Sequence, residues 1–108
     1  MIKRMTLAAA LAGGATSNHD YINTTTRLFI LERVWATASG KLKVEIQTGA
    51  TTTALTTSWV GFNSTANPAV DVDCSGIRVA TSGVVRVIRT NNDTAAQDVY
   101  STIMGFLG

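Results

Sequence analysis

Few residues of this chain could carry out covalent chemistry. Its 108 residues include one histidine, His19, and one cysteine, Cys74. His19 stands beside Asp20, and an imidazole held by a carboxylate is the arrangement that activates a nucleophile. This pair lies in an irregular, turn-rich stretch, however, and Cys74 ends an alternating segment at an inward position, where a free cysteine packs as a small apolar side chain. We therefore expect no catalytic residues and no enzymatic activity.

Carboxylates offer a second kind of chemistry. Asp71 and Asp73 stand two residues apart, so they share one face of a strand, as paired acids in a glycoside hydrolase could. Together with Asn63, Asn67 and Asp93 they could also supply oxygen ligands to Ca²⁺. No apolar pocket is evident that would raise the pKa of either aspartate, and the spacing matches no ion-binding loop. We expect no metal and no cofactor, and a single cysteine with a single histidine excludes a Cys/His zinc site.

The charge pattern argues against nucleic acid and membrane as partners. The net charge is +2, and Arg78, Arg86 and Arg89 form at most a short basic stripe without interleaved aromatic residues. Ion pairs between subunits or plain solvation explain these arginines better. The longest run of low polarity, residues 5–15, is about half the length that a membrane-spanning helix needs. We expect neither partner.

Sugar binding remains an alternative. Carbohydrate sites on β-sandwiches use exposed aromatic rings as stacking platforms beside polar side chains. The candidates are Trp35, Trp59, Tyr21 and Tyr100. Both tryptophans lie within apolar strand patterns, which predicts that they are buried in the core.

The elements that must position these residues are strands. Threonine occurs seventeen times and serine seven times, against two glutamates and three lysines, and β-branched residues favour extended backbone. Residues 28–38 form a strand with two apolar faces, Phe29, Leu31 and Trp35 on one and Leu28, Ile30, Val34 and Ala36 on the other. Residues 41–48 alternate cleanly, with Leu42, Val44 and Ile46 inward. The Ser39-Gly40 turn between the two segments predicts a hairpin.

The rest of the chain continues this pattern. Short strands are expected at residues 58–62, 69–74, 77–80, 84–90 and 97–106, separated by turns that include Ser75-Gly76 and Ser82-Gly83. Residues 49–57 are either a loop or a weak edge strand. Seven or eight strands at this spacing predict an all-β fold, an antiparallel two-sheet sandwich, and we favour a jelly-roll-like over an immunoglobulin-like arrangement.

The first 26 residues differ from the remainder. Residues 1–15 have the basic start of a signal peptide, but the apolar stretch at residues 7–11 is at the short limit, so we expect the segment to be retained. We expect residues 1–26 to form an extended N-terminal arm and its connection, and residues 27–108 to form the sandwich. Small residues and the Gly13-Gly14 hinge suggest an arm that lies on another subunit. The expected partner-binding residues are Met1, Ile2, Lys3, Arg4, Met5, Leu7 and Leu11.

The second half of the chain resembles a known class of proteins. The segments are residues 59–65 (WVGFNST), 70–73 (VDVD), 85–91 (VRVIRTN) and 98–106 (DVYSTIMGF). In style and strand order they resemble the small β-sandwich decoration, or cement, proteins of tailed-bacteriophage capsids. The resemblance implies a virion protein on the capsid exterior, a trimer or dimer that binds between subunits of the major capsid protein, and of these two we expect the homotrimer. A carbohydrate-binding or ring-forming component of a phage tail or fibre is the alternative.

Overall fold

The structure, a computed structural model that describes all 108 residues, consists of eight strands in two sheets. Sheet A has the strand order β1-β8-β3-β6, and sheet B has the order β2-β7-β4-β5. The strands are β1 (Ile2–Leu11), β2 (Thr16–Ile22), β3 (Phe29–Ala38), β4 (Leu42–Gly49), β5 (Leu55–Phe62), β6 (Ala69–Val79), β7 (Val84–Asn91) and β8 (Gln97–Leu107). All pairings are antiparallel. No helix capable of spanning a membrane is present.

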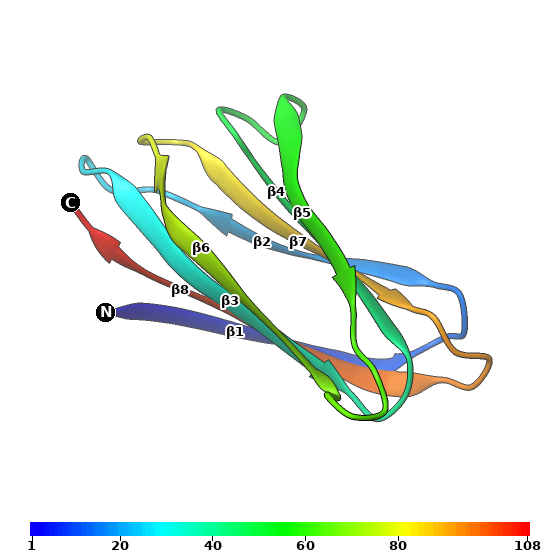
Figure 1. Cartoon of the computed structure of the whole chain (residues 1–108). Helices are drawn as coiled ribbons and strands as arrows, with labels where there is room; N and C mark the ends of the chain where they lie inside the picture. The colour runs from blue at the N-terminus through cyan, green and yellow to red at the C-terminus, as the bar shows by residue number, and fades with distance from the viewer.

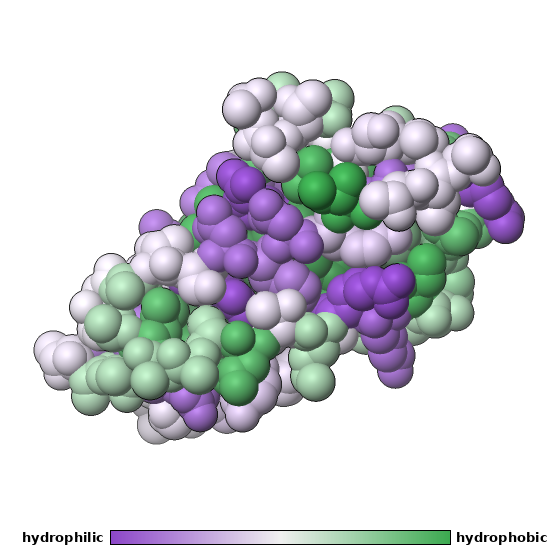
Figure 2. All heavy atoms as spheres, turned by 180° about the vertical axis from the view of Figure 1, so that it is seen from behind, coloured by the Kyte–Doolittle hydropathy of each residue, from purple (hydrophilic) through white to green (hydrophobic).

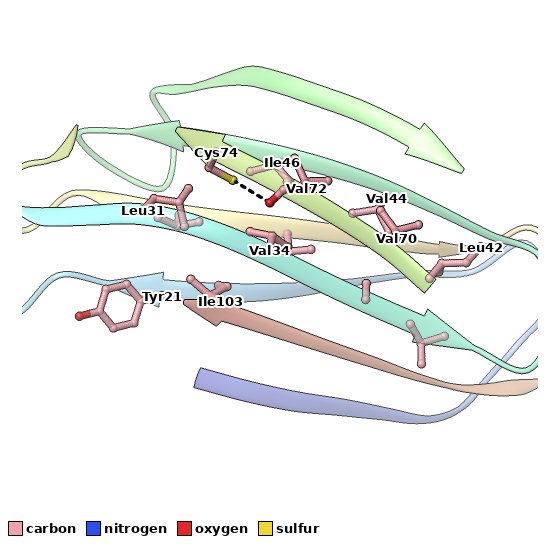
Figure 3. Close-up of a cluster of buried hydrophobic side chains, with 14 of the residues drawn as sticks. Tyr21, Leu31, Val34, Leu42, Val44, Ile46, Val70, Val72, Cys74 and Ile103 are labelled. Carbon is pink, nitrogen blue, oxygen red and sulfur yellow. Dashed lines mark hydrogen bonds between the residues drawn. The ribbon is translucent and has the colours of Figure 1, made fainter. Parts of the chain in front are cut away.

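The two sheets pack face to face around an apolar core (Figure 1). Side chains from both sheets meet there, among them Leu31 and Val34 of β3 and Val44 and Ile46 of β4 (Figure 3). All four are fully buried. The prediction of an all-β, two-sheet antiparallel sandwich is therefore confirmed.

Alternation in the sequence sets the inward faces of several strands correctly. Leu42, Val44 and Ile46 of β4 are buried as predicted, and so are Val70, Val72 and Cys74 of β6. Burial raises the pKa of the Cys74 thiol to about 11, so the side chain behaves as an apolar group of the core. The expected structural role of Cys74 is confirmed.

The predicted hairpin between residues 28–38 and 41–48 is wrong. β3 belongs to sheet A, where it pairs with β6 and β8, whereas β4 belongs to sheet B. The Ser39-Gly40 segment therefore crosses from one sheet to the other. A strand with an apolar face can lie beside its successor or opposite it across the core, and alternation is the same in both cases. The only consecutive strands that pair are β4 and β5.

A β-bulge changes which residues of β3 share a face. The pairing of β3 with both neighbours shifts between Leu31 and Arg33, so Val34, rather than Trp35, follows Leu31 on the inward side. The predicted faces of this strand were therefore wrong beyond Leu31, because an extra residue reverses the alternation. Opposite the bulge, Ser75 and Gly76 have φ values of 53° and 74°. They bend β6 rather than ending it, so residues 69–74 and 77–79 form one strand.

The expected N-terminal arm is not confirmed. Residues 2–11 form β1, which pairs with β8 at the edge of sheet A, and residues 16–22 form β2, which pairs with β7. The stretch that we interpreted as an irregular connection is therefore largely strand. Ile2, Thr6 and Ala8 alternate with exposed Lys3, Met5 and Leu7. That period of two was obscured by the small, uniformly apolar residues that follow.

Buried amide side chains hold the connections that cross between the sheets. The side chain of Asn91 donates to the carbonyl oxygens of Leu11 and Ala95, both at 2.8 Å. Gln97 donates to Asn91 Oδ1 at 2.6 Å and accepts from the backbone N–H of Gly40 at 2.6 Å. These bonds satisfy backbone groups where no neighbouring strand can.

Candidate functional site: the outer face of sheet A

The outward side chains of sheet A form the surface that we call face A. Register aligns Lys3, Met104, Arg33 and Asp73 in one row across the four strands. The next rows are Met5, Thr102, Trp35 and Asp71, then Leu7, Tyr100, Thr37 and Ala69. On the other side of the first row lie Phe106, Ile30 and Arg78, and Met1 precedes β1 at the same end of the sheet.

Face A is apolar over β1 and β8. Met5 is 71% exposed, Leu7 46% and Phe106 42%. Met1 and Tyr100 are exposed as well. Large side chains of this kind, gathered on two adjacent strands, are typical of a surface that contacts another protein.

Charged residues lie mainly on the other half of face A. Arg33 donates to Asp71 at 2.7 Å, and this ion pair links β3 to β6. Asp73 accepts a hydrogen bond from the backbone N–H of Ser75 at 2.8 Å but forms no ion pair within the chain. Lys3, at the opposite edge of the same row, also has no carboxylate partner. The β1 edge of face A thus presents an unpaired cation, Lys3, and the β6 edge presents an unpaired anion, Asp73, together with a second unpaired cation, Arg78.

The structure divides the expected partner-binding residues into two groups. Met1, Lys3, Met5 and Leu7 are exposed on face A. Ile2 and Leu11 are half-buried and pack against the core. Arg4 points to the inner side, where its guanidinium lies 5.9 Å from the ring centroid of Tyr21. The exposed group is continued by residues of β8 and β3 that sequence reasoning missed, because the pairing of β1 with β8 could not be foreseen.

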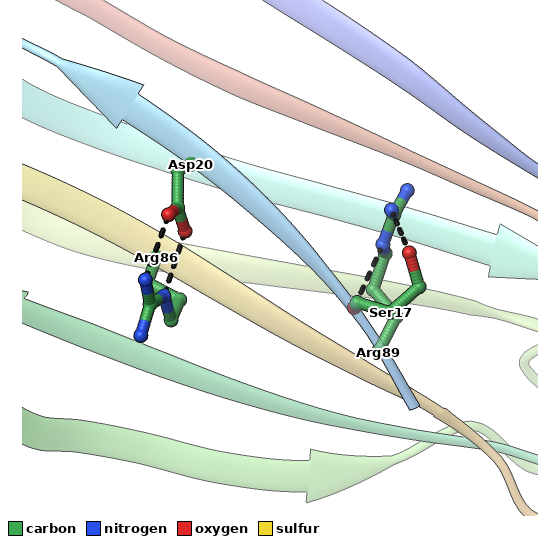
Figure 4. Close-up of polar contacts among 4 residues, drawn as sticks. All are labelled: Ser17, Asp20, Arg86 and Arg89. Atoms are coloured by element: carbon green, nitrogen blue, oxygen red, sulfur yellow. Dashed lines mark hydrogen bonds and ion pairs between the residues drawn. The ribbon is translucent and has the colours of Figure 1, made fainter. Parts of the chain in front are cut away.

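The outer face of sheet B, which we call face B, is different. Asp20 of β2 and Arg86 of β7 form a two-bonded ion pair, with both N–O distances 2.8 Å (Figure 4). This pairing holds the pKa of Asp20 below its usual value. On β4, Glu45 accepts hydrogen bonds from Gln47 and from Thr57 of β5. Seen from behind, the molecule has hydrophilic side chains across its middle and apolar ones in separate clusters (Figure 2).

A polar cluster lies inside the sandwich, between β1, β2, β7 and β8. Arg89 is 1% exposed, and its guanidinium donates to the carbonyl oxygen of Thr6 at 3.1 Å. It also donates to the hydroxyl of Ser101 at 3.2 Å. A further bond, at 2.9 Å, runs to the hydroxyl of Ser17 (Figure 4). No carboxylate is bonded to Arg89, so neutral oxygens alone satisfy a buried cation. These bonds tie the edge strand β1 to sheet B.

His19 completes this cluster. Its Nδ1 lies 2.6 Å from the hydroxyl oxygen of Ser101. Burial, helped by the positive charge of Arg89 and opposed by Asp20, lowers the pKa of His19 to about 4. Because Ser101 accepts from Arg89, its own hydrogen can point to Nδ1 of a neutral His19. A serine bonded to a histidine resembles a nucleophile and its base, but Ser101 is fully buried and out of reach of any substrate.

A pocket of about 510 Å³ lies at one end of the sandwich, lined by residues that include Lys41, Asn63 and Asp93. Hydrogen bonds from the backbone N–H groups of Thr94 and Lys41 lower the pKa of Asp93. Asn63 is occupied in holding the backbone, since its side chain bonds to Leu42, Gly40 and Pro68. Of the possible calcium ligands, only Asn63 and Asp93 line this pocket. Nowhere do three or more His, Cys, Asp or Glu side chains gather as metal ligands would.

The structure separates the four aromatic candidates. Tyr21 is buried, with its ring centroid 4.5 Å from that of Phe29, and Trp59 packs against the core. Trp35 instead lies on face A, so its predicted burial in the core is wrong. Tyr100 is on the same face, one row away on the adjacent strand.

The three arginines of the supposed stripe are likewise apart. Arg78 is on face A, Arg86 is on face B, and Arg89 lies inside. An explanation by solvation or by contacts between subunits is wrong for Arg89, which bonds within the chain.

No protein-family model and no curated protein matches the chain. Function therefore has to be argued from face A and from the arrangement of the strands.

Proposed function

We propose that this protein is a non-enzymatic structural component of a virion that decorates or cements the exterior of an icosahedral capsid. Face A carries the proposal: it is a broad sheet face whose apolar half is exposed to water in the single chain. In the assembled particle this face is covered by another copy of the chain. The oligomer so formed binds between subunits of the major capsid protein.

The arrangement of the strands supports this proposal. Each sheet combines strands from both halves of the sequence, and all connections except β4–β5 pass from one sheet to the other. We interpret the orders β1-β8-β3-β6 and β2-β7-β4-β5 as a jelly roll, an architecture common among viral capsid and lectin domains. Fold alone assigns no function, so the weight rests on the exposed apolar face.

Particle binding tests the proposal. Purified chain is added to capsids that lack it, and the bound copies are counted by electron microscopy and quantitative gel analysis. We expect many copies per shell, and we expect Met5→Asp with Leu7→Asp to abolish binding, because two charges would have to be desolvated at the contact. Point changes are preferable to removing the first residues, since β1 is a strand of sheet A. The proposal is wrong if no particle binds the chain, or if the double variant binds as the unmodified chain does.

Sugar binding is a second candidate because Trp35 and Tyr100 stand on adjacent strands of face A. Two aromatic rings on adjacent strands of one face could form a stacking platform for a sugar. A glycan array would show binding that Trp35→Ala removes and Trp59→Ala does not, with both variants folded. Absence of binding on the array would eliminate this candidate.

A further inference from the structure

We infer that face A packs against face A of a second copy. The two copies are related by a two-fold axis that lies between their two A sheets and runs parallel to the strands. The inference rests on the proposed function, since it names the partner and the arrangement at the same surface. It follows from the area of face A and from the positions of its charges.

The area suits a stable contact. Four strands about ten residues long, spaced by about 4.8 Å and rising about 3.3 Å per residue, cover on the order of 600 Å². A typical specific interface buries about 800 Å² on each partner. Stacked sheets can lie about 10 Å apart with their strands rotated by about 30°. Face A is thus large enough to form most of a dimer interface.

The charges select the direction of the axis. An axis parallel to the strands, midway between β8 and β3, places β1 of one copy opposite β6 of the other. Lys3 then faces the partner's Asp73, and by symmetry Asp73 faces the partner's Lys3, because both belong to one row. Neither has an ion pair within its own chain. The arrangement provides each with the opposite charge that it lacks.

An axis perpendicular to the strands is less favourable. It would place β6 on β6 and reverse the order of the rows. With the axis midway between the rows of Asp73 and Asp71, Asp73 would face the partner's Asp71, and Lys3 would face the partner's Met5 rather than a carboxylate. Like charges brought together at an interface are repulsive. An axis centred over β8 would set Lys3 opposite the partner's Arg33, with the same disadvantage.

Most of the remaining contacts of the parallel arrangement are compatible with burial, and the exception is Arg78, which faces the positively charged amino terminus of the partner's Met1 at the end of the interface. Phe106 faces the partner's Ile30, and Leu7 faces the partner's Ala69, so apolar side chains meet apolar ones. Arg33 needs no charge from the second copy because Asp71 is bonded to it at 2.7 Å. The result is a closed, isologous dimer.

A charge exchange tests this arrangement in the full-length chain. Sedimentation velocity over a range of concentrations should show a dimer for the unmodified chain. Lys3→Asp and Asp73→Lys should each weaken the dimer by about tenfold or more, because each places like charges opposite each other twice. The double variant, which keeps the net charge, should restore dimerisation to within about threefold. Lys43→Asp on face B is the matched control and should have no effect.

The outcomes separate this inference from the proposed function. A monomeric unmodified chain, or a double variant no tighter than the single ones, overturns the parallel two-fold arrangement. Capsid binding by such a chain would leave the decorating function standing and would place the capsid protein, rather than a second copy, on face A. A dimer with charge rescue but without capsid binding would support the arrangement and contradict the function. Thermal unfolding of each variant checks that Asp73→Lys, which removes the bond to Ser75, still folds.

Discussion

Faces A and B are the outer surfaces of the two sheets that enclose one core. They differ in how their charged residues are paired and in where apolar residues are exposed. On face B, Asp20 and Arg86 are joined by two hydrogen bonds, and Glu45 accepts from two neighbours. On face A, Lys3 and Asp73 lie unpaired at opposite edges, with exposed Met5, Leu7 and Phe106 on β1 and β8. Face B also exposes apolar residues, Ile22 on β2 and Val60 and Phe62 on β5, but these lie on its two opposite edge strands. On face A the exposed apolar residues lie together on the adjacent strands β1 and β8. Face A is therefore the better candidate for contact with another molecule.

The interior beneath the two faces differs as well. Behind β4 the core is apolar, with Val44 and Ile46 fully buried. Behind β1 lies the cluster of Arg89, His19 and Ser101. The edge strand of face A is held by its pairing with β8 and, in addition, by the bond from buried Arg89 to Thr6, and loss of this buried cation gives the largest expected effect.

Arg89→Ala should damage face A most. It removes the bonds to Thr6 and Ser17 and leaves buried oxygens without donors, so we expect a loss of about 3 kcal/mol in the free energy of unfolding. Urea denaturation measures this loss, and hydrogen exchange should show the amides of β1 opening first. Arg86→Ala on face B serves as the control and should cost about 1 kcal/mol or less. Equal losses in the free energy of unfolding for Arg89→Ala and Arg86→Ala would contradict the expected difference between the two faces.

Low pH should destabilise the polar cluster that lies behind β1. The unfolded chain protonates His19 near pH 6.5, whereas the folded chain resists protonation down to about pH 4. Stability is therefore complete above pH 6.5 and is lost as the pH falls from 6.5 to 4, by up to about 3 kcal/mol. Thermal unfolding across this range measures the loss. His19→Gln should flatten the profile, and an unchanged slope in that variant would show that other groups are responsible.

Asp20→Ala should have a smaller effect, confined to face B. The ion pair with Arg86 is partly exposed, so its loss should cost about 0.5–1 kcal/mol in urea denaturation. High salt should reduce the difference between the variant and the unmodified chain, because screening weakens the pair. Dimerisation should be unaffected, and a weaker dimer would place face B in the interface.

Val60→Asp should change least. Val60 is exposed on the edge strand β5, and the substitution adds a charge where face B already meets water. We expect a loss of about 0.5 kcal/mol in unfolding, because the new carboxylate lies directly across from Glu45 of β4, and no change in dimerisation. Sedimentation of this variant beside Met5→Asp compares the two faces directly. A dimer disrupted equally by both would remove the distinction between them.

Sequence alone predicted the fold class because period-two burial is local. Alternation correctly predicted the inward residues of β4 and β6, among them Leu42, Val44, Val70 and Val72. Within one strand, the position of a residue alone decides the face on which its side chain lies. The same signal could not tell that β3 and β4 belong to different sheets. Which strands pair depends on segments far apart in the sequence, and the alternation within one strand does not indicate which strand it pairs with.

The site was predicted only in part, for two physical reasons. Met5 and Leu7 were identified as contact residues, but Trp35 was assigned to the core because the bulge at residues 31–33 could not be seen in the pattern. Arg89 alternates with Val85 and Val87, which was itself a signal for the inward side. Its charge argued against burial, and the oxygens that make burial possible come from Thr6, Ser17 and Ser101, which are distant in sequence.

The order of strands in sheet A bears on how the chain folds. β8 lies between β1 and β3, so its pairing with β1 joins residues that are 86 to 103 positions apart in the sequence. Contacts of such separation slow folding. Until β8 is in place β1 has no neighbouring strand, so β1 is the segment through which partly folded copies would associate first.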